Sequence, residues 1–331
     1  MPDAEKPRGG DMGAKTVKPA VSVVIPTYNR AHSIERSIQS VLRQTFADFE
    51  LIIVDDGSTD GTQDLVRAIK DPRVRLVSMP QNGGPGAARN LGIREAVADW
   101  VAFQDSDDEW LPEKLERQMA RALEPGSSWV AVYCGMVTIG SVIDQAATRN
   151  QIRFRPGPEI AVVEGDIRAS LFKTSFVSAQ MLMARRVALE TVGGFDESFR
   201  VLEDWDLALR LAALGPFAFV DQPLVLQRFS VDSVTRDGEK WVPARARLYA
   251  KHHDAMAMAP TVLAEHYRSL SGSYRRWGDR QTELDLLEKA DRLHPAGLSA
   301  KLRLWTLRLA AMTGRLGTPA GPDAVDVKGK A

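Results

Sequence analysis

The sequence has only one cysteine, Cys134, among its 331 residues. A single thiol excludes an internal disulfide framework and a zinc site built from cysteines. It lies within the apolar stretch "WVAVYCGM", where we expect a small buried side chain rather than a catalytic thiol. An excess of charge of either sign is also missing, because 43 basic residues balance 43 acidic ones. This balance provides no overall attraction to nucleic acid, so we expect no nucleic-acid partner.

Long apolar runs are absent as well. No stretch of 18 apolar residues occurs, so we expect no membrane-spanning helix. Residues 1–19 lack the apolar core of a secretory signal, and their proline, glycine and charged residues are typical of a flexible arm. Residues 316–331 have a similar composition and predict a disordered tail. We therefore expect a cytoplasmic protein that is folded between about residues 20 and 315.

The first hundred folded residues alternate between strand-like and helix-like segments. Each apolar, β-branched segment is followed by a stretch with helical periodicity or N-cap residues. Four such alternations predict an α/β fold, with a parallel sheet covered by helices on both faces. Ligands of such sheets bind beyond the carboxyl ends of the strands. The predicted strands are 21–25, 50–57, 74–79 and 100–104.

Beyond residue 125 the pattern is less regular. Strands are expected at 129–140 and 178–184, and two short strands around Gln222-Pro223. From about residue 240 the pattern becomes helical, with two or three helices interrupted at Gly278 and at 295–297.

The stretch "QDSDDEW" crowds acidic residues after the fourth predicted strand: Asp105, Asp107, Asp108 and Glu109. Carboxylates this close repel one another unless a cation compensates. Mg²⁺ and Mn²⁺ prefer oxygen ligands, and Mg²⁺ typically takes one or two carboxylates plus substrate phosphates. The cluster therefore fits a metal–nucleotide diphosphate. It equally fits a solvated turn whose last acids, Asp108 and Glu109, cap the next helix.

Polar residues also follow the first two predicted strands. Thr27, Tyr28 and Asn29 come after the first, and Asp55 and Asp56 end the second. The tyrosine ring is able to stack on a base, and a carboxylate here is able to accept hydrogen bonds from a base or ribose. Turn chemistry accounts for the glycines that follow, but not for two consecutive acids after "LIIV". All these tails are expected at the same edge of the sheet.

Two further stretches carry candidate chemistry. The loop "NGGPGAARN" resembles a phosphate-cradling loop before a helix, but Arg89 fills the last glycine place of G-x-G-x-x-G. This residue is a candidate for contact with the substrate. In "EDWDLALR", Glu203 and Asp204 begin a helix, whose dipole favours negative charge there. The alternative is that one of them is a general base in a partly desolvated cleft.

Taken together, these stretches resemble the family 2 glycosyltransferases, which are inverting enzymes of the GT-A fold. The resemblance covers roughly residues 20–230 and rests on the order of the motifs rather than on any one of them. The motifs are "VSVVIPTYNR", "IIVDDGSTDGT", "GPGAARNLGI", "QDSDDEW" and "GGFDE…EDWDLALRLAALG". It implies a GT-A, Rossmann-like, mixed but mostly parallel sheet flanked by helices, with a nucleotide-binding half (20–125) and an acceptor half (126–240). The helical pattern beyond it adds a C-terminal helical extension (241–315).

The resemblance also implies roles for individual residues. The nucleotide-binding set would be Thr27, Tyr28, Asn29, Asp55, Asp56, Arg89 and Asp105. The family's D-x-D motif maps onto Asp105-Ser106-Asp107, so that Asp107, with Asp105, would bind Mn²⁺ or Mg²⁺ on the diphosphate. The family's E-D pair maps onto Glu203-Asp204, with Asp204 the preferred catalytic base. Such enzymes transfer a sugar from a nucleotide-diphosphate sugar, here expected to be a UDP-sugar, to a hydroxyl of a saccharide or lipid-linked acceptor.

The sequence lacks two features of some family members, and their absence bears on the type of transfer and on the residues expected at the diphosphate. The Q-x-x-R-W motif and membrane helices of processive synthases are missing, which favours single-sugar transfer in surface polysaccharide or glycolipid synthesis. The histidine that many relatives carry after the E-D helix is also missing from "QRFSVDSVTRDGEKW", where Arg228 or Arg236 is a candidate for the diphosphate.

The helical region lies outside the resemblance. Its arginines lie among apolar residues and predict either a basic surface for peripheral contact with the inner face of the membrane, or helices packed on the catalytic domain or on a second copy. These residues are Arg275, Arg276, Trp277, Arg303, Leu304, Trp305, Arg308, Leu309 and Arg315.

Two other functions are compatible with the fold class. A sugar-nucleotide nucleotidyltransferase would share the sheet and the metal chemistry, but "IPTYNRAHS" lacks the expected basic glycine-rich loop with a lysine. An inert helical interaction protein on a GT-A fold would be expected to have lost its acids. Asp105, Asp107 and Asp204 are all present.

Overall fold

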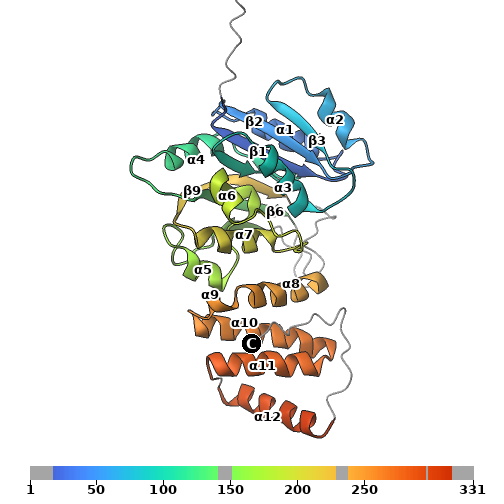
Figure 1. Ribbon diagram of the computed structural model, residues 1–331, viewed down its shortest axis with the longest axis vertical. Coiled ribbons are helices and arrows are strands. Elements are labelled where there is room, and N and C mark those ends of the chain that lie inside the picture. The colour runs from blue at the N-terminus through green and yellow to red at the C-terminus, as the bar shows by residue number, and fades with distance from the viewer. Residues whose placement is uncertain (1–17, 141–150, 229–237, 296, 315–331) are drawn as a thin grey trace, which may run out of the picture.

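The computed structural model describes residues 18–140, 151–228, 238–295 and 297–314. These residues form a nine-stranded mixed sheet with helices packed against it, and a stack of helices that extends away from it (Figure 1). The strands are β1 (Val21–Thr27), β2 (Phe49–Asp55), β3 (Val74–Ser78), β4 (Trp100–Phe103), β5 (Glu109–Trp110), β6 (Ala131–Gly140), β7 (Gln151–Arg155), β8 (Leu182–Arg185) and β9 (Phe217–Arg228). The helices are α1 (Ile34–Leu42), α2 (Thr62–Ala68), α3 (Pro85–Glu95), α4 (Lys114–Ala122), α5 (Arg168–Lys173), the 3-10 helix η1 (Ala179–Met181), α6 (Arg186–Thr191), α7 (Glu203–Ala212), α8 (Gly238–Lys251), α9 (His253–Met256), α10 (Pro260–Trp277), α11 (Arg280–Leu293) and α12 (Leu298–Met312).

The first half of the sheet is parallel, in the order β3-β2-β1-β4. Every residue of β1 is buried, which explains why this strand is rich in Val and Ile and does not alternate between apolar and polar residues. Each predicted strand of this half is present within two residues of its expected ends. Because the strands are parallel, their carboxyl ends meet at one edge, with Thr27 paired to Asp55. The expected convergence of the polar tails is confirmed.

The second half makes the sheet mixed. From β4 the order continues β8-β6-β9-β5, with β7 paired to the outer part of β6. β8 runs antiparallel to both β4 and β6, whereas β6 and β9 are parallel. The predicted mixed α/β class is confirmed.

Two predicted elements differ from the structure. The segment 217–228 forms one strand, β9, and not two short strands around Gln222-Pro223. Its pairing with β6 shifts register at Gly135, which lies opposite Pro223, so a β-bulge absorbs the proline that donates no ladder hydrogen bond. In the segment 178–184, residues Ala179–Met181 form η1, and strand β8 begins only at Leu182.

The C-terminal helices α8, α10, α11 and α12 lie one beyond the other, progressively farther from the sheet (Figure 1). The expected break at Gly278 is confirmed, because this residue ends α10 with φ +80°, a conformation that suits glycine. Asp279 then caps α11 by accepting a hydrogen bond from the Thr282 N–H at 3.0 Å. The predicted boundary at 240 falls in the first turn of α8, and the one at 125 falls between α4 and β6.

Helix α12 ends this stack and exposes an apolar stripe. Its exposed members are Leu298, Leu302, Trp305, Leu309 and Met312. Leu304, which the sequence assigned to an amphipathic surface, is instead buried against α11, and Arg303 and Arg308 pair with Glu283 and Glu288 of that helix. Arg315 lies outside the described residues. Membrane contact or self-association through this helix stays a prediction, and no helix in the described ranges is long and apolar enough to cross a membrane.

Helix α3 approaches the sheet closely at Gly92. A Cβ atom at this position would lie 2.3 Å from Cγ1 of Val24, a fully buried residue of β1. The glycine therefore allows α3 to lie directly on β1, and it fixes the height above the sheet of Arg89, one turn earlier in the helix.

We expect Gly92→Ala to lower the free energy of unfolding by ~1–3 kcal/mol, because the added methyl group overpacks the core. Gly272→Ala is the matched control, since a Cβ at this position of α10 would meet nothing within 4 Å. It should raise the free energy of unfolding by up to ~1 kcal/mol through helix propensity. Urea denaturation measures both, and stabilisation by Gly92→Ala would contradict the close packing.

Candidate active site

The ends of β1 and β2 form the floor of the candidate site. Thr27 and Asp55 are paired and buried. One carboxylate oxygen of Asp55 accepts hydrogen bonds from the Ser58 N–H (3.1 Å) and from Gln63 Nε2 (2.6 Å). The other oxygen, and Thr27 Oγ1, have no hydrogen-bond partner within the described residues. Buried unpaired oxygens are costly, so a ligand with hydrogen-bonding groups would be stabilised at this edge.

Tyr28 and Asn29 follow β1 and have different environments. Tyr28 is 45% exposed, so its ring is open to a ligand. Asn29 has a left-handed backbone with φ +51°. Its side chain accepts a hydrogen bond from the Thr59 N–H at 2.8 Å, and its own N–H donates to Ser58 Oγ at 2.9 Å. The structure thus uses Asn29 to join the β1 end to the turn after β2, while the nucleotide contacts of both residues stay predictions.

Asp56 binds the glycine-rich loop. Its carboxylate accepts hydrogen bonds from the N–H groups of Gly83 (2.6 Å) and Gly84 (2.8 Å). Burial raises the pKa of Asp56, while these two hydrogen bonds and Arg200 act to lower it. The loop resembles a phosphate-cradling loop in sequence, but in the structure a protein carboxylate binds these two amides in the place of an anion.

The acidic cluster after β4 divides into two pairs. Asp105 and Asp107 are partly buried at the site. Burial raises the pKa of Asp107, and the neighbouring Asp105 raises it further, while Arg30 and His32 lie near enough to lower it. The carboxylate of Asp107 is therefore in a position where added positive charge would be favourable.

Asp108 and Glu109 do not cap the next helix, and that prediction is wrong. Asp108 is buried and accepts hydrogen bonds from the Arg228 N–H (3.1 Å) and from Gln180 Nε2 (3.1 Å). Glu109 begins β5, which pairs with β9, and its carboxylate contacts Arg36 and Arg228. Both acids therefore join the end of β4 to the second half of the sheet. Arg228, a candidate for the diphosphate, is instead paired with Glu109, and Arg236 lies outside the described residues.

Arg89 connects the two halves of the site. Its buried guanidinium lies 2.7 Å from an oxygen of Asp105 and 2.8 Å from an oxygen of Glu203, over the ring of Phe195. Burial acts to lower the pKa of Arg89, but Asp105 and Glu203 outweigh it and hold the pKa above its usual value. Arg89 was expected to bind the nucleotide; the structure gives it two carboxylate partners of the protein, and contact with a nucleotide stays a prediction.

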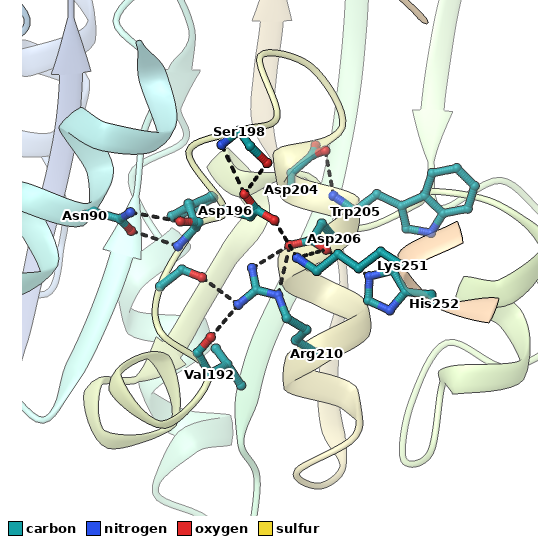
Figure 2. Close-up of polar contacts among 12 residues, drawn as sticks. Asn90, Val192, Asp196, Ser198, Asp204, Trp205, Asp206, Arg210, Lys251 and His252 are labelled. Carbon is teal, nitrogen blue, oxygen red and sulfur yellow. Dashed lines mark hydrogen bonds and ion pairs between the residues drawn. The ribbon is translucent and has the colours of Figure 1, made fainter. Parts of the chain in front are cut away.

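Asp204 lies in the first turn of α7 beside Glu203. One of its oxygens accepts a hydrogen bond from the N–H of Trp205 at 2.7 Å (Figure 2). The indole of Trp205 donates to the Leu171 carbonyl at 2.8 Å. Burial, with the charge of Glu203, raises the pKa of Asp204 to about 7, against the opposing effects of the Trp205 N–H, Arg89 and Arg155. A carboxylate with this pKa is suited to accept a proton near neutral pH.

Comparison with known families decides the identity of this arrangement. The sequence profile described as "Glycosyl transferase family 2" matches residues 22–193. The chain belongs to this family. The match includes the ends of β1, β2 and β4 and the whole of α3, whereas Glu203-Asp204 and the C-terminal helices lie beyond it.

This family 2 glycosyltransferase is similar to curated proteins whose names give a biosynthetic role or a reaction. It is 34% identical over 200 residues to the succinoglycan biosynthesis protein ExoO of Rhizobium meliloti, across 60% of this chain and 57% of ExoO. It is 34% identical over 134 residues to the Escherichia coli enzyme WfgD, a UDP-Glc:α-D-GlcNAc-diphosphoundecaprenol β-1,3-glucosyltransferase, across 40% of this chain and 53% of WfgD. The matches thus span about half the length of these relatives.

Solved structures share the fold. TarS 1–349 from S. aureus in complex with UDP-GlcNAc aligns with a TM-score of 0.65 at 19% identity, covering 90% of this chain and 93% of that one. The mannosyltransferase PcManGT from Pyrobaculum calidifontis, in complex with GDP-Man and Mn²⁺, aligns with a TM-score of 0.53 at 23% identity, covering 91% and 85%. These likenesses identify the fold of this family 2 glycosyltransferase as GT-A.

A divalent metal fits the candidate site only as part of a substrate complex. The described residues contain no group of three or more His, Cys, Asp or Glu side chains that could hold a metal by themselves. A metal on a diphosphate needs only one or two protein carboxylates. Asp107 fits this requirement, because burial raises the pKa of its carboxyl group. One oxygen of Asp105 already contacts Arg89.

Several residues of the site escaped sequence reasoning. Asn90 holds the loop at Phe195, Arg200 donates to the Gly83 carbonyl, and Asp206 binds α8. Asn90 and Asp206 lie within stretches that the sequence analysis considered, "AARN" and "EDWD", but their partners are more than 40 residues away. No local pattern identifies such partners.

We expect Arg89→Met to lower the free energy of unfolding by ~3 kcal/mol or more, because it leaves two carboxylates without their cation in a largely buried place. Arg168→Met is the matched control, since Arg168 forms an exposed ion pair with Asp166. This control should cost no more than ~1 kcal/mol. Denaturant unfolding compares the two, and equal small effects would contradict the role of Arg89.

Proposed function

We propose that this family 2 glycosyltransferase is an inverting, metal-dependent enzyme that transfers a sugar from a UDP-sugar to a hydroxyl group. The observation that carries the proposal is Arg89, because one buried guanidinium binds both Asp105 of the acidic cluster and Glu203 beside Asp204. The candidate diphosphate site and the candidate base therefore lie at the same edge of the sheet.

The donor nucleotide would bind across the ends of β1 and β2. The exposed ring of Tyr28 offers a stacking face, and the unpaired oxygens of Thr27 and Asp55 offer hydrogen-bond partners to base or ribose. Asp56 would contribute through its remaining lone pairs, since each of its oxygens already accepts one N–H. UDP as the nucleotide is supported by the UDP-GlcNAc complex of TarS and by the UDP-Glc named for WfgD.

Asp107, with Asp105, would hold Mn²⁺ or Mg²⁺ against the donor diphosphate. When bound, the metal would neutralise the charge that builds on the leaving diphosphate. The chain's own part is to fix Asp105: Arg89 holds its carboxylate, and Ser37 Oγ donates to its backbone carbonyl at 2.8 Å.

Asp204 would be the general base. Its carboxylate would take the proton from the acceptor hydroxyl as that oxygen bonds to the anomeric carbon and the bond to UDP breaks on the opposite face. Glu203 is the weaker candidate, because its carboxylate is bound to Arg89. One displacement inverts the anomeric centre and needs no covalent nucleophile.

The acceptor would be a saccharide or a lipid-linked saccharide of a surface polysaccharide or glycolipid. This part of the proposal is supported by the names of ExoO and WfgD, the second of which acts on a sugar carried by diphosphoundecaprenol. A lipid-linked acceptor would bring the enzyme to the inner face of the membrane.

UDP should raise the melting temperature only when Mn²⁺ or Mg²⁺ is present, because the diphosphate would bind through the metal. We expect a rise of a few degrees with 1 mM UDP and Mn²⁺, none with a chelator, and loss of the metal-dependent part in Asp107→Asn. Asp166→Asn, an exposed acid remote from the acidic cluster, is the matched control. Equal stabilisation by UDP in chelator would overturn the metal role.

Asp204→Asn should retain binding of UDP with Mn²⁺ and lose transfer by ~10²–10⁴-fold, because the amide cannot accept the proton. In the unsubstituted enzyme, kcat/KM should fall about tenfold per pH unit below about 7, since protonation of Asp204 removes the base. A coupled assay of UDP release measures both the transfer rate of Asp204→Asn and the pH dependence of kcat/KM. The UDP-sugar for this assay is first identified by thermal shift. Asp254→Asn, at an exposed acid of α9, serves as control; wild-type transfer by Asp204→Asn would show that the base lies elsewhere.

A further inference from the structure

Asp206, two residues after the proposed base on α7, is fully buried yet charged. Its carboxylate contacts Arg210 of the same helix at 2.6 Å, and Lys251 Nζ and His252 Nε2 of the C-terminal region at 2.7 and 2.8 Å (Figure 2). Burial acts to raise the pKa of Asp206, but these three partners hold it below its usual value. Two of the three partners, Lys251 and His252, therefore reach this carboxylate from outside α7.

Lys251, the last residue of α8, has a second acidic partner. Its ammonium group also lies 2.7 Å from Asp196, in the loop that precedes α7 (Figure 2). Arg247, one turn earlier in α8, donates to the carbonyl of Ser198 in the same loop at 2.9 Å. Helix α8 thus binds both the catalytic helix and the loop that leads into it.

The same loop is fastened to α3. Asn90 donates to the Phe195 carbonyl at 2.9 Å and accepts from the Phe195 N–H at 2.7 Å (Figure 2). Asn90 directly follows Arg89, which binds Glu203 in the first turn of α7. These contacts form a closed ring. Helix α3 binds the loop, the loop binds α8, α8 binds α7, and α7 binds α3. We call this set the contact ring; its members are Arg89, Asn90, Phe195, Asp196, Glu203, Asp206 and Lys251.

We propose that Lys251 is a positioning residue for transfer, acting through Asp206 to hold the first turn of α7, and with it Asp204, in place. The inference rests on the proposed function, in which Asp204 is the base. Asp204 lies between two anchors of the same helix turn, Glu203 on Arg89 and Asp206 on Lys251. Loss of Lys251 weakens the anchor at Asp206, which keeps only His252 and Arg210, and a displacement of about 1 Å at a catalytic group is enough to lower its efficiency strongly.

A consequence concerns the C-terminal helices. Lys251 lies 58 positions beyond the family match, which ends at residue 193. The proposal therefore makes the end of α8 a part of the catalytic architecture, and the full chain is the unit to test.

The test compares Lys251→Met, Lys251→Arg and the matched control Arg303→Met in the full chain. Arg303 forms an ion pair of similar length, 2.7 Å, with the buried Glu283 between α11 and α12, remote from the contact ring. We expect Lys251→Met to lower kcat by about 10–100-fold with KM for the UDP-sugar unchanged, since donor contacts are not altered. Lys251→Arg should restore most of kcat, and Arg303→Met should retain it.

Amide hydrogen exchange provides a readout that does not depend on activity. The amide hydrogens of residues 203–206 should exchange at least about tenfold faster in Lys251→Met than in the unsubstituted chain. Their exchange rates should be unchanged in Arg303→Met, because only the first substitution loosens α7. If Lys251→Met fails to fold, His252→Gln is tested in its place, because this substitution also weakens the contacts that hold the Asp206 carboxylate. Unchanged kcat with a folded variant, or an equal loss in Arg303→Met, would overturn the proposal. Absence of transfer in the unsubstituted chain would instead refute the proposed function, while the exchange rates still test the anchoring.

Discussion

Arg89 lies buried between carboxylates that come from opposite halves of the chain, Asp105 after β4 and Glu203 in α7. Two acids this close would repel each other, and each would lose solvation at the sheet edge. The guanidinium compensates both charges with its two ends, a geometry that the compact ammonium group of lysine does not provide. Its own place depends on Gly92, which lets α3 lie on β1. The distance between the acidic cluster and the E-D pair therefore follows from one buried cation.

Around this contact the site is built from carboxylates that the protein already uses. Asp56 binds two amides of the glycine-rich loop, and Asp108 binds the backbone of β9. Burial and neighbouring like charges raise the pKa of both Asp107 and Asp108, but Asp108 is buried and accepts hydrogen bonds from Arg228 and Gln180, whereas Asp107 is only partly buried at the site. This difference explains how a cluster of four acids is stable: most of its charge is neutralised by the fold, and what remains is available to a cation.

Helix α7, which carries the proposed base, is held from both sides. Glu203 is bound from the sheet side through Arg89, and Asp206 from the C-terminal side through Lys251 and His252. Between them, the pKa of Asp204 is raised to about 7 because burial and the charge of Glu203 disfavour its anion. The two anchors fix the position of this carboxylate through charge-assisted contacts that are short and directional.

The sequence by itself determined the strands of the parallel half, the convergence of their polar ends and the order of the family motifs, because all of these follow from local periodicity and from residues close in the chain. Only the tertiary structure decided what each acid contacts. The partners of Asp108, Arg89 and Asp206 lie 120, 114 and 46 residues away, and the single strand around Pro223 depends on a bulge opposite β6. Such pairings are set by how whole elements pack, since a carboxylate carries no local signal of whether a metal, an amide or an arginine will neutralise it.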